Sequence, residues 1–391
     1  MEKIIKIGMV GAGRATELHM EAYKRVHSVR IVPQCIFDTD KERRKAAKER
    51  FGFEFETDSF DELLNNEEID VIDICSPPYT HIEMARRALE NGKHVVCEKP
   101  LGGYFGDGLE AENVGKTPKR IMYEKLLKSL EGLKETVNST DKKFMYAENF
   151  IYAPAIVKAA EIISAKKSRI LFIKGEESLK GSSSPVAGLW SKTGGGTMIR
   201  TGTHPLSAAL WLKHKESVAR GEKIYVKSVV ADMECITPTL SEYEHRHIAA
   251  SPIDVEDIGT IIITFSDKSR AVIIATDTLL GGSRNYVELY CNDAALNCRL
   301  TMNDSMSTYF LDEDGLSDVD ISEMLPSKLG WNNPFIEDET MRGYMAEMQN
   351  FMGAVAFGDK VESDFELAYD TIRVIYAAYL SAEEGKRIEL D

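Results

Sequence analysis

The strongest evidence for a fold comes from an apolar run that ends in a glycine-rich turn. Residues 4–10 have the composition of a buried strand, and a helix is expected from about residue 17 to residue 26. The turn between them consists of Gly11, Ala12, Gly13, Arg14, Ala15 and Thr16. A strand, a tight glycine turn and a helix in this order are typical of the first unit of a parallel, doubly wound sheet.

The same alternation of strand and helix continues to about residue 149. Apolar strands are predicted at residues 29–37, 71–75, 94–97 and 143–149, with helices at residues 40–50, 80–91 and 121–137. Thr80 and Glu83 have capping-box spacing, which places the start of one helix there. The alternation favours a parallel sheet of the Rossmann type. The glycine-rich residues 102–119 interrupt it and predict a long irregular loop, either functional or a plain surface insertion.

The pattern changes after about residue 150. Helices are predicted at residues 155–165, 341–357 and 365–384, and strands at residues 169–176, 225–234, 260–265, 271–276, 286–291 and 296–302. Closely spaced strands joined by short turns indicate a large open, mainly antiparallel sheet. We therefore expect an N-terminal Rossmann domain over residues 1–150 and a C-terminal α/β domain over residues 151–391.

Composition argues against several classes of protein. The 391 residues carry a net charge of −15, which disfavours binding to nucleic acid or to an anionic membrane surface. We find no apolar run of membrane-spanning length and no signal-peptide pattern at the N-terminus. The six cysteines lack paired spacing, which is typical of reduced thiols. We therefore expect a cytoplasmic protein with no nucleic-acid or membrane partner.

Asp38 gives the glycine turn a more specific meaning. It lies 27 residues after Gly11, at the end of the second predicted strand. An acid at this place accepts hydrogen bonds from the adenosine ribose and repels a 2′-phosphate, which favours NAD over NADP. Arg43 and Arg44 lie nearby and would weaken that discrimination. The alternative is a glycine turn beside a solvated aspartate, with Thr16 in place of the third glycine of the usual fingerprint.

A cation follows the strand predicted at residues 94–97, within the tripeptide Glu98-Lys99-Pro100. Ligands of doubly wound sheets bind at the carboxyl ends of the strands, so we expect Lys99 to stand beside the dinucleotide. A surface lysine after a strand is the alternative interpretation.

These residues resemble the Gfo/Idh/MocA oxidoreductase family, which includes glucose–fructose oxidoreductase and inositol dehydrogenase. The matching motifs are Gly11-Ala12-Gly13, Asp38, Ser76-Pro77 with His81, residues 92–95 leading into Glu98-Lys99-Pro100, Gly194-Gly195-Gly196, Gly202-Thr203-His204 and residues 381–385. The resemblance covers nearly the whole chain. It implies a Rossmann domain followed by an α/β domain whose open sheet often mediates a homo-oligomer, here a dimer or a tetramer.

The resemblance also implies where the site residues lie. The lysine and the downstream histidine of the family sit at the nicotinamide and the substrate, which makes Lys99 and His204 the catalytic candidates, and the Lys–Pro bond is often cis. The cofactor-binding candidates are Gly11, Ala12, Gly13, Arg14, Ala15, Asp38, Ser76, Pro77, His81, Glu98 and Lys99. The substrate-binding candidates are Asn149, Tyr152, Trp190, Arg200 and Thr203. Packing would explain His81, Asn149, Tyr152 and Trp190 as well as ligand binding does.

Arg200 departs from the family pattern, because many members carry an aspartate four residues before the histidine. The family's acid–base network therefore cannot simply be copied, and Arg200 could bind an anionic or polyhydroxylated substrate. Histidine ordinarily titrates near neutral pH and lysine near pH 10, which favours His204 as the base and Lys99 as the electrostatic partner of the substrate oxygen. The alternative is Lys99 as the base, which requires that burial or a nearby cation such as Arg200 lower its pKa.

A metal site is a weaker interpretation of another sequence feature. His245 and His247 flank Arg246, with two glutamates upstream. Two further ligands would be needed, so a solvated loop explains the histidines better, and we expect no metal.

Three functions are compatible with this sequence. The leading one is an NAD-dependent dehydrogenase that acts on a secondary hydroxyl of a sugar, cyclitol or glycoside. The second is a glycosidase that uses NAD transiently through oxidation, elimination and reduction. The third is a non-catalytic NAD-binding sensor, which the missing aspartate favours and the retention of Lys99 and His204 disfavours.

Overall fold

A computed structural model of the chain describes residues 3–108, 110–301, 308–314, 327–332 and 338–390. The chain forms two compact units that interleave along the sequence. The first comprises Met1–Tyr152, Trp190–Gly194 and Gly343–Ala377, and the second comprises Ala153–Leu189, Gly195–Arg342 and Ala378–Asp391. As domain boundaries, residues 1–150 and 151–391 stay a prediction.

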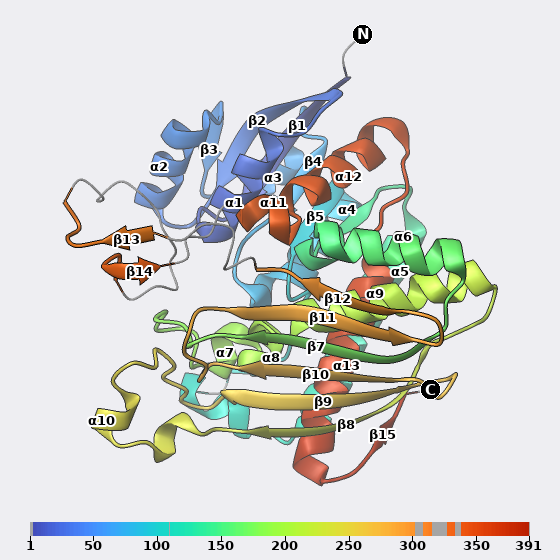
Figure 1. The fold of residues 1–391 in the computed structure, drawn as a ribbon. Coiled ribbons are helices and arrows are strands. Elements are labelled where there is room, and N and C mark those ends of the chain that lie inside the picture. The colour runs from blue at the N-terminus through green and yellow to red at the C-terminus, as the bar shows by residue number, and fades with distance from the viewer. Residues whose placement is uncertain (1–2, 109, 302–307, 315–326, 333–337, 391) are drawn as a thin grey trace. The chain divides into compact units, whose positions relative to one another are not determined.

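The first unit contains a six-stranded parallel sheet in the order β3-β2-β1-β4-β5-β6 (Figure 1). Its strands are β1 (Lys3–Val10), β2 (Val29–Phe37), β3 (Phe55–Thr57), β4 (Val71–Ile74), β5 (His94–Glu98) and β6 (Phe144–Ala147). The strand order reverses between β1 and β4, which is the place where doubly wound sheets bind their ligands. The predicted Rossmann sheet is confirmed.

Helices α2 (Lys41–Phe51), α3 (Phe60–Asn65), α4 (His81–Glu90) and α12 (Tyr344–Phe357) contact strands of this sheet. The first unit also contains α1 (Arg14–Tyr23), α5 (Lys119–Ser139) and most of α13 (Phe365–Glu384), with short turns η1 (Pro78–Thr80), η2 (Ala111–Lys116), η3 (Asn149–Tyr152) and α7 (Trp190–Thr193). Helix α1 begins at Arg14, three residues before the predicted start, because Gly13 already occupies the N-cap position. The predicted capping box at Thr80 is wrong, since the Thr80 side chain accepts no backbone N–H of α4; its hydroxyl donates to the Pro77 carbonyl.

The second unit contains a seven-stranded sheet in the order β12-β11-β7-β10-β9-β8-β15. Its strands are β7 (Ile170–Ser178), β8 (Val226–Glu234), β9 (Ile258–Phe265), β10 (Arg270–Thr276), β11 (Arg284–Cys291), β12 (Ala295–Arg299) and β15 (Ile388–Glu389). Only the pair β7–β10 of this sheet is parallel, so the prediction of a mainly antiparallel sheet is confirmed. A separate ladder joins β13 (Thr308–Phe310) and β14 (Gly330–Asn332), and residue 302, expected in the strand at 296–302, lies outside the described residues.

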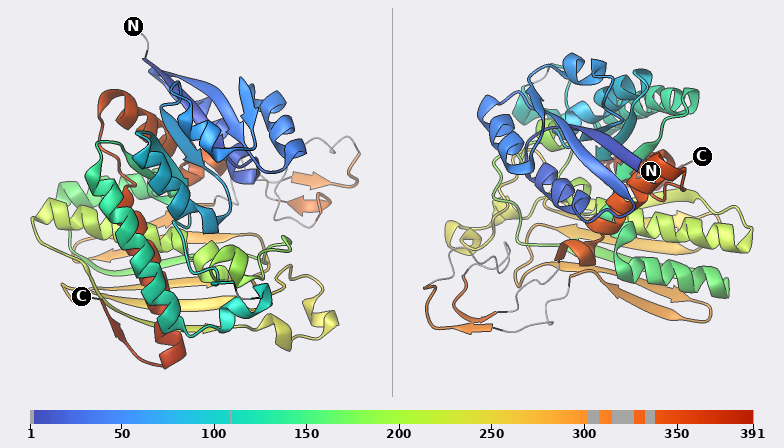
Figure 2. Two further views of the ribbon diagram at one scale, coloured as in Figure 1. Left: turned by 180° about the vertical axis from the view of Figure 1, so that it is seen from behind. Right: turned by 90° about the horizontal axis from the view of Figure 1, so that it is seen from above.

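Helices α6 (Pro154–Lys166) and α9 (Thr203–Arg220) lie side by side on one face of this second sheet (Figure 2). The side chains on that face are fully buried and include Ile173, Ile261, Ile263, Ile273 and Leu289. A Cβ on Gly175 would stand 2.9 Å from the Cβ of Pro205, so glycine allows α9 to approach β7 closely. The remaining helices are α8 (Thr197–Arg200), α10 (Glu242–His245), α11 (Asp338–Arg342) and the turn η4 (Thr237–Thr239).

Candidate active site

The glycine turn has the geometry of a phosphate-binding turn. Gly11 has a φ of 97°, and a Cβ there would lie 2.8 Å from the Cys75 carbonyl oxygen, so only glycine fits. The Thr16 hydroxyl donates to the Gly11 carbonyl at 2.7 Å, which fixes the turn without the third glycine. At Gly13 no described atom lies within 4 Å of the place where a Cβ would stand, which leaves open backbone at the N-terminus of α1 for a pyrophosphate.

Asp38 lies beside this turn, directly after β2. Its Oδ2 accepts a hydrogen bond from the Ala12 N–H at 2.8 Å, and its Oδ1 accepts one from the Asp40 N–H at 2.8 Å. A carboxylate has about four acceptor positions, so these bonds orient the group and leave capacity for ribose hydroxyls. Arg43 and Arg44 form ion pairs with other aspartates. The residues present therefore fit NAD.

The loop after β4 holds the next cofactor candidates. The two ring nitrogens of His81 lie 2.8 Å from the carbonyl oxygens of Pro100 and Ser76, and the side chain is buried. Burial lowers the pKa of His81, while both carbonyls oppose that change. His81 thus connects the loop after β4 to the segment after β5. Pro77, which lies between Ser76 and the start of α4, is exposed. These contacts account for His81 through packing alone.

Lys99 directly follows β5, at the sheet edge where the glycine turn also lies. The Glu98 carboxylate accepts the Lys99 backbone N–H at 2.8 Å through Oε2. Its other oxygen, Oε1, lies 3.2 Å from Nε2 of His19. The Lys99–Pro100 peptide bond is cis, as the family resemblance implies. Glu98 is therefore fixed on both oxygens, which holds the backbone that carries Lys99.

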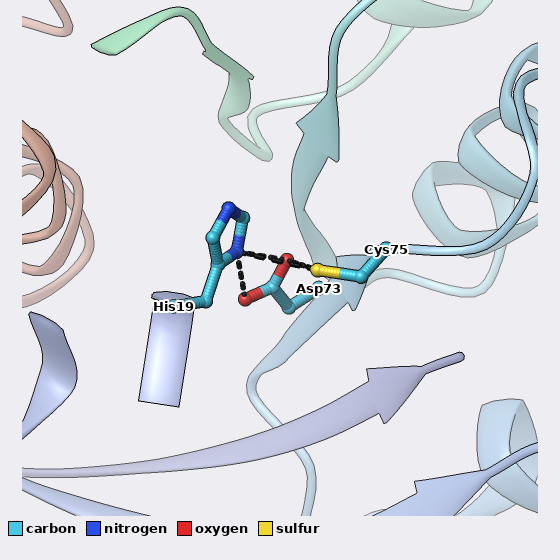
Figure 3. Close-up of side chains that lie close together, drawn as sticks. All are labelled: His19, Asp73 and Cys75. Carbon is cyan, nitrogen blue, oxygen red and sulfur yellow. Dashed lines mark hydrogen bonds and ion pairs between the residues drawn. The ribbon is translucent and has the colours of Figure 1, made fainter. Parts of the chain in front are cut away.

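A buried polar cluster contacts Glu98 through His19. Figure 3 shows three of its side chains, His19, Asp73 and Cys75. Nδ1 of His19 lies 2.9 Å from Oδ2 of Asp73, and the Tyr23 hydroxyl donates to the same oxygen at 2.8 Å. The Cys75 thiol donates to Oδ1 of Asp73 at 3.5 Å and lies 3.4 Å from Nδ1 of His19. The ring of His19 therefore faces a carboxylate on each side, Asp73 at Nδ1 and Glu98 at Nε2.

The protonation states of this cluster follow from its geometry. Burial would lower the pKa of His19, but the opposing effects of the neighbouring Asp73 and Cys75 together raise that pKa well above its usual value. Burial, with Asp73, raises the pKa of the Cys75 thiol to about 12. These shifts favour the protonated forms of both side chains. His19, Asp73 and Cys75 are also metal-ligand types within 4.8 Å of one another, but mutual hydrogen bonds explain them without a metal ion.

Glu347 on α12 is a buried carboxyl in the same unit. Both of its oxygens are inaccessible and have no hydrogen-bond partner among the described residues. Burial raises the pKa of Glu347 well above its usual value, and the nearby Glu98 and Glu148 carboxylates reinforce that rise against His19. This shift favours the protonated form of Glu347.

The second unit holds the other catalytic candidate. His204 lies in the first turn of α9, buried, with its backbone N–H donating to the Thr201 carbonyl at 3.1 Å. Thr203 starts the helix, and its buried hydroxyl has no partner among the residues that the structure describes. Arg200 ends α8, one turn before His204, and forms an ion pair with Asp277.

The three remaining substrate candidates all belong to the first unit and are buried. The Tyr152 hydroxyl donates to the Asn350 side chain at 2.8 Å and accepts the Ser363 N–H at 3.0 Å. The Trp190 indole N–H donates to the Tyr104 carbonyl at 3.1 Å, in the glycine-rich loop. These bonds give Tyr152 and Trp190 a structural role. Asn149 lies buried in η3, and its role in substrate binding stays a prediction.

Several residues of the site escape reasoning from sequence alone. Asp73 sits inside a fully buried strand, and Glu347 stands among apolar residues of α12. A lone acid within an apolar run is the signal that would have singled out both. Asp277 follows β10 and shows no such signal, because its partner Arg200 is 77 residues away in sequence.

The comparison with family models identifies the class of protein. The model described as "Oxidoreductase family, NAD-binding Rossmann fold" matches residues 5–115. The model described as "Oxidoreductase family, C-terminal alpha/beta domain" matches residues 173–390. The chain therefore belongs to the Gfo/Idh/MocA family of NAD-binding oxidoreductases.

Curated relatives of the chain are named dehydrogenases. Levoglucosan dehydrogenase of Pseudarthrobacter phenanthrenivorans is 24% identical over 99% of this chain and 98% of its own length. D-glucoside 3-dehydrogenase of Escherichia coli is 21% identical over 99% of this chain and 97% of its own. Myo-inositol 2-dehydrogenase of Thermotoga maritima is 32% identical, over only 26% of this chain and 30% of its own.

Solved structures share the fold at low sequence identity. GenD2 from gentamicin A biosynthesis, in complex with NAD, has a TM-score of 0.77 at 20% identity, covering 100% of this chain and 97% of that one. Levoglucosan dehydrogenase with NADH and levoglucosan has a TM-score of 0.72 at 20% identity, covering 99% of both chains. Within the described part of this chain, no helix is long and apolar enough to cross a membrane.

Proposed function

We propose that this protein uses NAD to oxidise a secondary hydroxyl of a sugar, cyclitol or sugar-like glycoside. Family membership supports the reaction class, and three relatives are named for levoglucosan, D-glucosides and myo-inositol. The observation that carries the proposal is the edge of the first sheet. There the open glycine turn, Asp38 and Lys99 all follow the carboxyl ends of parallel strands.

The residues of the first unit would bind and orient the cofactor. The backbone at Gly13 and the N-terminus of α1 would bind the pyrophosphate, and Asp38 would accept hydrogen bonds from the adenosine ribose. NAD, when bound, supplies the acceptor for the hydride. The fixed carboxylate of Glu98 would keep the Lys99 backbone in place during the reaction.

Two side chains would handle the proton and the charge on the substrate oxygen. His204 would accept the hydroxyl proton, because histidine is the side chain that ordinarily exchanges protons near neutral pH. The Lys99 ammonium would donate hydrogen bonds to the same oxygen and stabilise its developing negative charge. This assignment gives Lys99 an electrostatic role and His204 the role of general base.

A substrate screen tests the proposal. The purified protein is incubated with NAD and levoglucosan, myo-inositol, scyllo-inositol or methyl D-glucosides, and NADH is followed by its absorbance. We expect net NADH with at least one compound and a loss of about 10²–10⁴-fold in kcat/KM for His204→Ala. Lys99→Met should lower kcat by a comparable factor. Aglycone release without net NADH would overturn the dehydrogenase in favour of the glycosidase, and full biological activity of Lys99→Met would favour the sensor.

An exposed apolar face on the second sheet extends the proposal to the assembly of the protein. The face of the second sheet opposite α6 and α9 carries exposed apolar side chains, Ile262 at 41% and Tyr290 at 40% among them. This face would join two copies of the chain in a homo-oligomer.

All six cysteines are free, which supports a reducing, cytoplasmic location.

A further inference from the structure

One buried histidine connects β4 to the residue before Lys99. Nδ1 of His19 lies 2.9 Å from Oδ2 of Asp73 in β4, and Nε2 lies 3.2 Å from Oε1 of Glu98 at the end of β5. The other Glu98 oxygen accepts the Lys99 backbone N–H at 2.8 Å. The side chains of His19 and Asp73 are inaccessible to solvent, and only 12% of the Glu98 side chain is exposed. This bridge therefore ends on the backbone of Lys99 and is shielded from water over most of its length.

A second buried histidine reaches the residue after Lys99. Nδ1 of His81 lies 2.8 Å from the Pro100 carbonyl oxygen, and Nε2 lies 2.8 Å from the Ser76 carbonyl oxygen, just beyond β4. His81 is 1% exposed, and the next residue of the segment, Leu101, is fully buried. Carbonyl oxygens only accept, so a proton on either ring nitrogen is directed at one of these two segments. The chain is thus connected to the end of β4 on both sides of Lys99.

The direction of these polar atoms distinguishes two roles. Glu98 and His81 are both cofactor-binding candidates by sequence. Each nitrogen of His81 faces a carbonyl oxygen of the protein, and each oxygen of Glu98 has a contact within the protein. A ligand-binding side chain presents a donor or an acceptor to the ligand, whereas these two present theirs to neighbouring segments of the chain. This arrangement favours a positional role over cofactor binding.

Position matters at Lys99 because its proposed role depends on geometry. An ammonium stabilises a developing negative charge only within hydrogen-bonding distance of that oxygen. A displacement of about 1 Å can lower a rate by about 10²-fold. Lysine carries its charge on a flexible four-carbon chain, so a fixed backbone is needed to restrict where the ammonium can reach.

We propose that His19 and His81 are positioning residues for the oxidation, which hold Lys99 from both sides through Glu98 and Pro100. The inference rests on the proposed function and gives a role to two histidines that do not themselves exchange a proton with the substrate. In this assignment Nε2 is the nitrogen of His19 that supports turnover, and Nδ1 is the corresponding nitrogen of His81.

Asparagine and glutamine variants test the two contacts of each ring separately. The amide nitrogen of asparagine lies close to the place of Nδ1 in histidine, and that of glutamine lies close to the place of Nε2. His19→Gln therefore keeps a donor toward Glu98, whereas His19→Asn keeps one toward Asp73. At position 81 the order is reversed, because Nδ1 of His81 is the nitrogen that faces Pro100.

We expect kcat to be at least about tenfold higher for His19→Gln than for His19→Asn. At position 81, kcat should be at least about tenfold higher for His81→Asn than for His81→Gln. The dissociation constant of NADH, measured by fluorescence, and the KM for NAD should stay within about twofold of the unaltered protein, because only the reacting geometry changes. His27→Asn and His27→Gln, at an exposed histidine beyond α1, are the controls and should have equal kcat.

Equal kcat for the two variants at either position would overturn the proposal. A raised dissociation constant of NADH would also overturn it, because the altered residue would then be a cofactor ligand. If both His19 variants fail to fold, the comparison at position 81 decides the proposal.

Hydrogen exchange at the Lys99 amide, measured without substrate, separates this proposal from the proposed function. Faster exchange in His19→Asn than in His19→Gln, with no sugar or cyclitol oxidised by the unaltered protein, would support the bridge to Lys99 and contradict the oxidation. Equal exchange in the two variants would overturn the bridge whatever the protein oxidises.

Discussion

His19 shows how a single buried residue can be both ionisable and structural. It is inaccessible to solvent, yet each ring nitrogen faces a carboxylate, so a proton on the ring is matched by negative charge within the protein. A buried ion that lost its partner would be strongly destabilising, which makes this arrangement specific. The consequence reaches Lys99, because the carboxylate that His19 holds is also the one that fixes the Lys99 backbone.

Glu347 gives a pH-dependent prediction at this scale. Its pKa is raised in the folded protein, so folding requires a proton that the unfolded chain gives up above about pH 4.5. The stability of the protein should therefore fall as pH rises, by up to about 1.4 kcal/mol per pH unit relative to Glu347→Gln, until the folded-state pKa is reached. Urea unfolding of both proteins at about pH 5 and about pH 8 measures the difference.

The matched control for that experiment is Glu49→Gln, an exposed glutamate on α2. The difference in free energy of unfolding between Glu49→Gln and the unaltered protein should be the same at both pH values. A constant difference for Glu347→Gln as well would show that Glu347 ionises alike in the folded and unfolded states.

Sequence reasoning located the residues that follow directly from strand ends. Gly11, Asp38 and Lys99 lie where a parallel sheet puts them, because each is defined by the strand before it. Asp277 and Glu347 were out of reach, since their importance comes from partners far away in sequence. The capping box at Thr80 failed for a local reason, because Thr80 already belongs to the helical turn η1 and its backbone lacks the extended conformation of a capping residue.

At the scale of elements, the glycine-rich loop is held by two aromatic anchors of the first unit. The Tyr376 hydroxyl donates to the Gly194 carbonyl at 2.7 Å and accepts the Tyr104 N–H at 2.6 Å. Trp190 binds the Tyr104 carbonyl from the other side. The loop after Lys99 is therefore tied to α13 and α7 rather than simply inserted.

We expect Tyr376→Phe to release this loop while keeping the packing of the ring. Two hydrogen bonds are lost, and the buried Tyr104 N–H loses the oxygen that accepts it. Leaving that N–H unsatisfied should lower the free energy of unfolding by about 1–3 kcal/mol. Urea unfolding measures the loss of stability, and hydrogen exchange should rise around Tyr104. Tyr225→Phe, at a tyrosine that is 52% exposed, is the control and should change neither quantity. Unaltered exchange at Tyr104 in Tyr376→Phe would contradict the anchor.

Element prediction succeeded where hydrophobic periodicity was present. The strands that were predicted matched to within a few residues, because their apolar runs are short and bounded by turn residues. The short edge strands β3 and β15 were missed, since three and two residues carry no apolar run. Helix α9 was missed, since it is buried on nearly all sides from Thr203 to Lys213 and shows little amphipathic period. The helix predicted at residues 341–357 is broken at Gly343, whose φ is 99°.

At the scale of the whole molecule, the exposed face of the second sheet predicts the oligomeric state. Ile262 pairs with Val272, which pairs with Lys174, so these side chains form one outward row across three strands. Tyr290 stacks on Phe172 in the neighbouring row, with ring centres 6.0 Å apart. Contiguous exposed apolar surface of this kind is typical of protein interfaces.

We expect the protein to form a dimer or tetramer in solution and Ile262→Asp to weaken its association at least about tenfold, because an unpaired charge would be buried at the interface. Light scattering after size-exclusion chromatography measures the mass over a concentration series. Val218→Asp alters an apolar residue on α9 that is 65% exposed, and it should keep the mass of the unaltered protein. A monomer at every concentration, or an unchanged mass for Ile262→Asp, would rule out this interface.

The cluster around His19 has a consequence for how rates are interpreted. The surroundings of this cluster raise the pKa of Cys75 to about 12 and raise the pKa values of His19 and Glu347 above their usual ranges. An inflection of a pH–rate profile at the usual value of a histidine is therefore not that of His19. Assigning such an inflection to the proton acceptor of the reaction requires that Glu347→Gln retain it, because a carboxyl with a raised pKa moves toward the same range of pH.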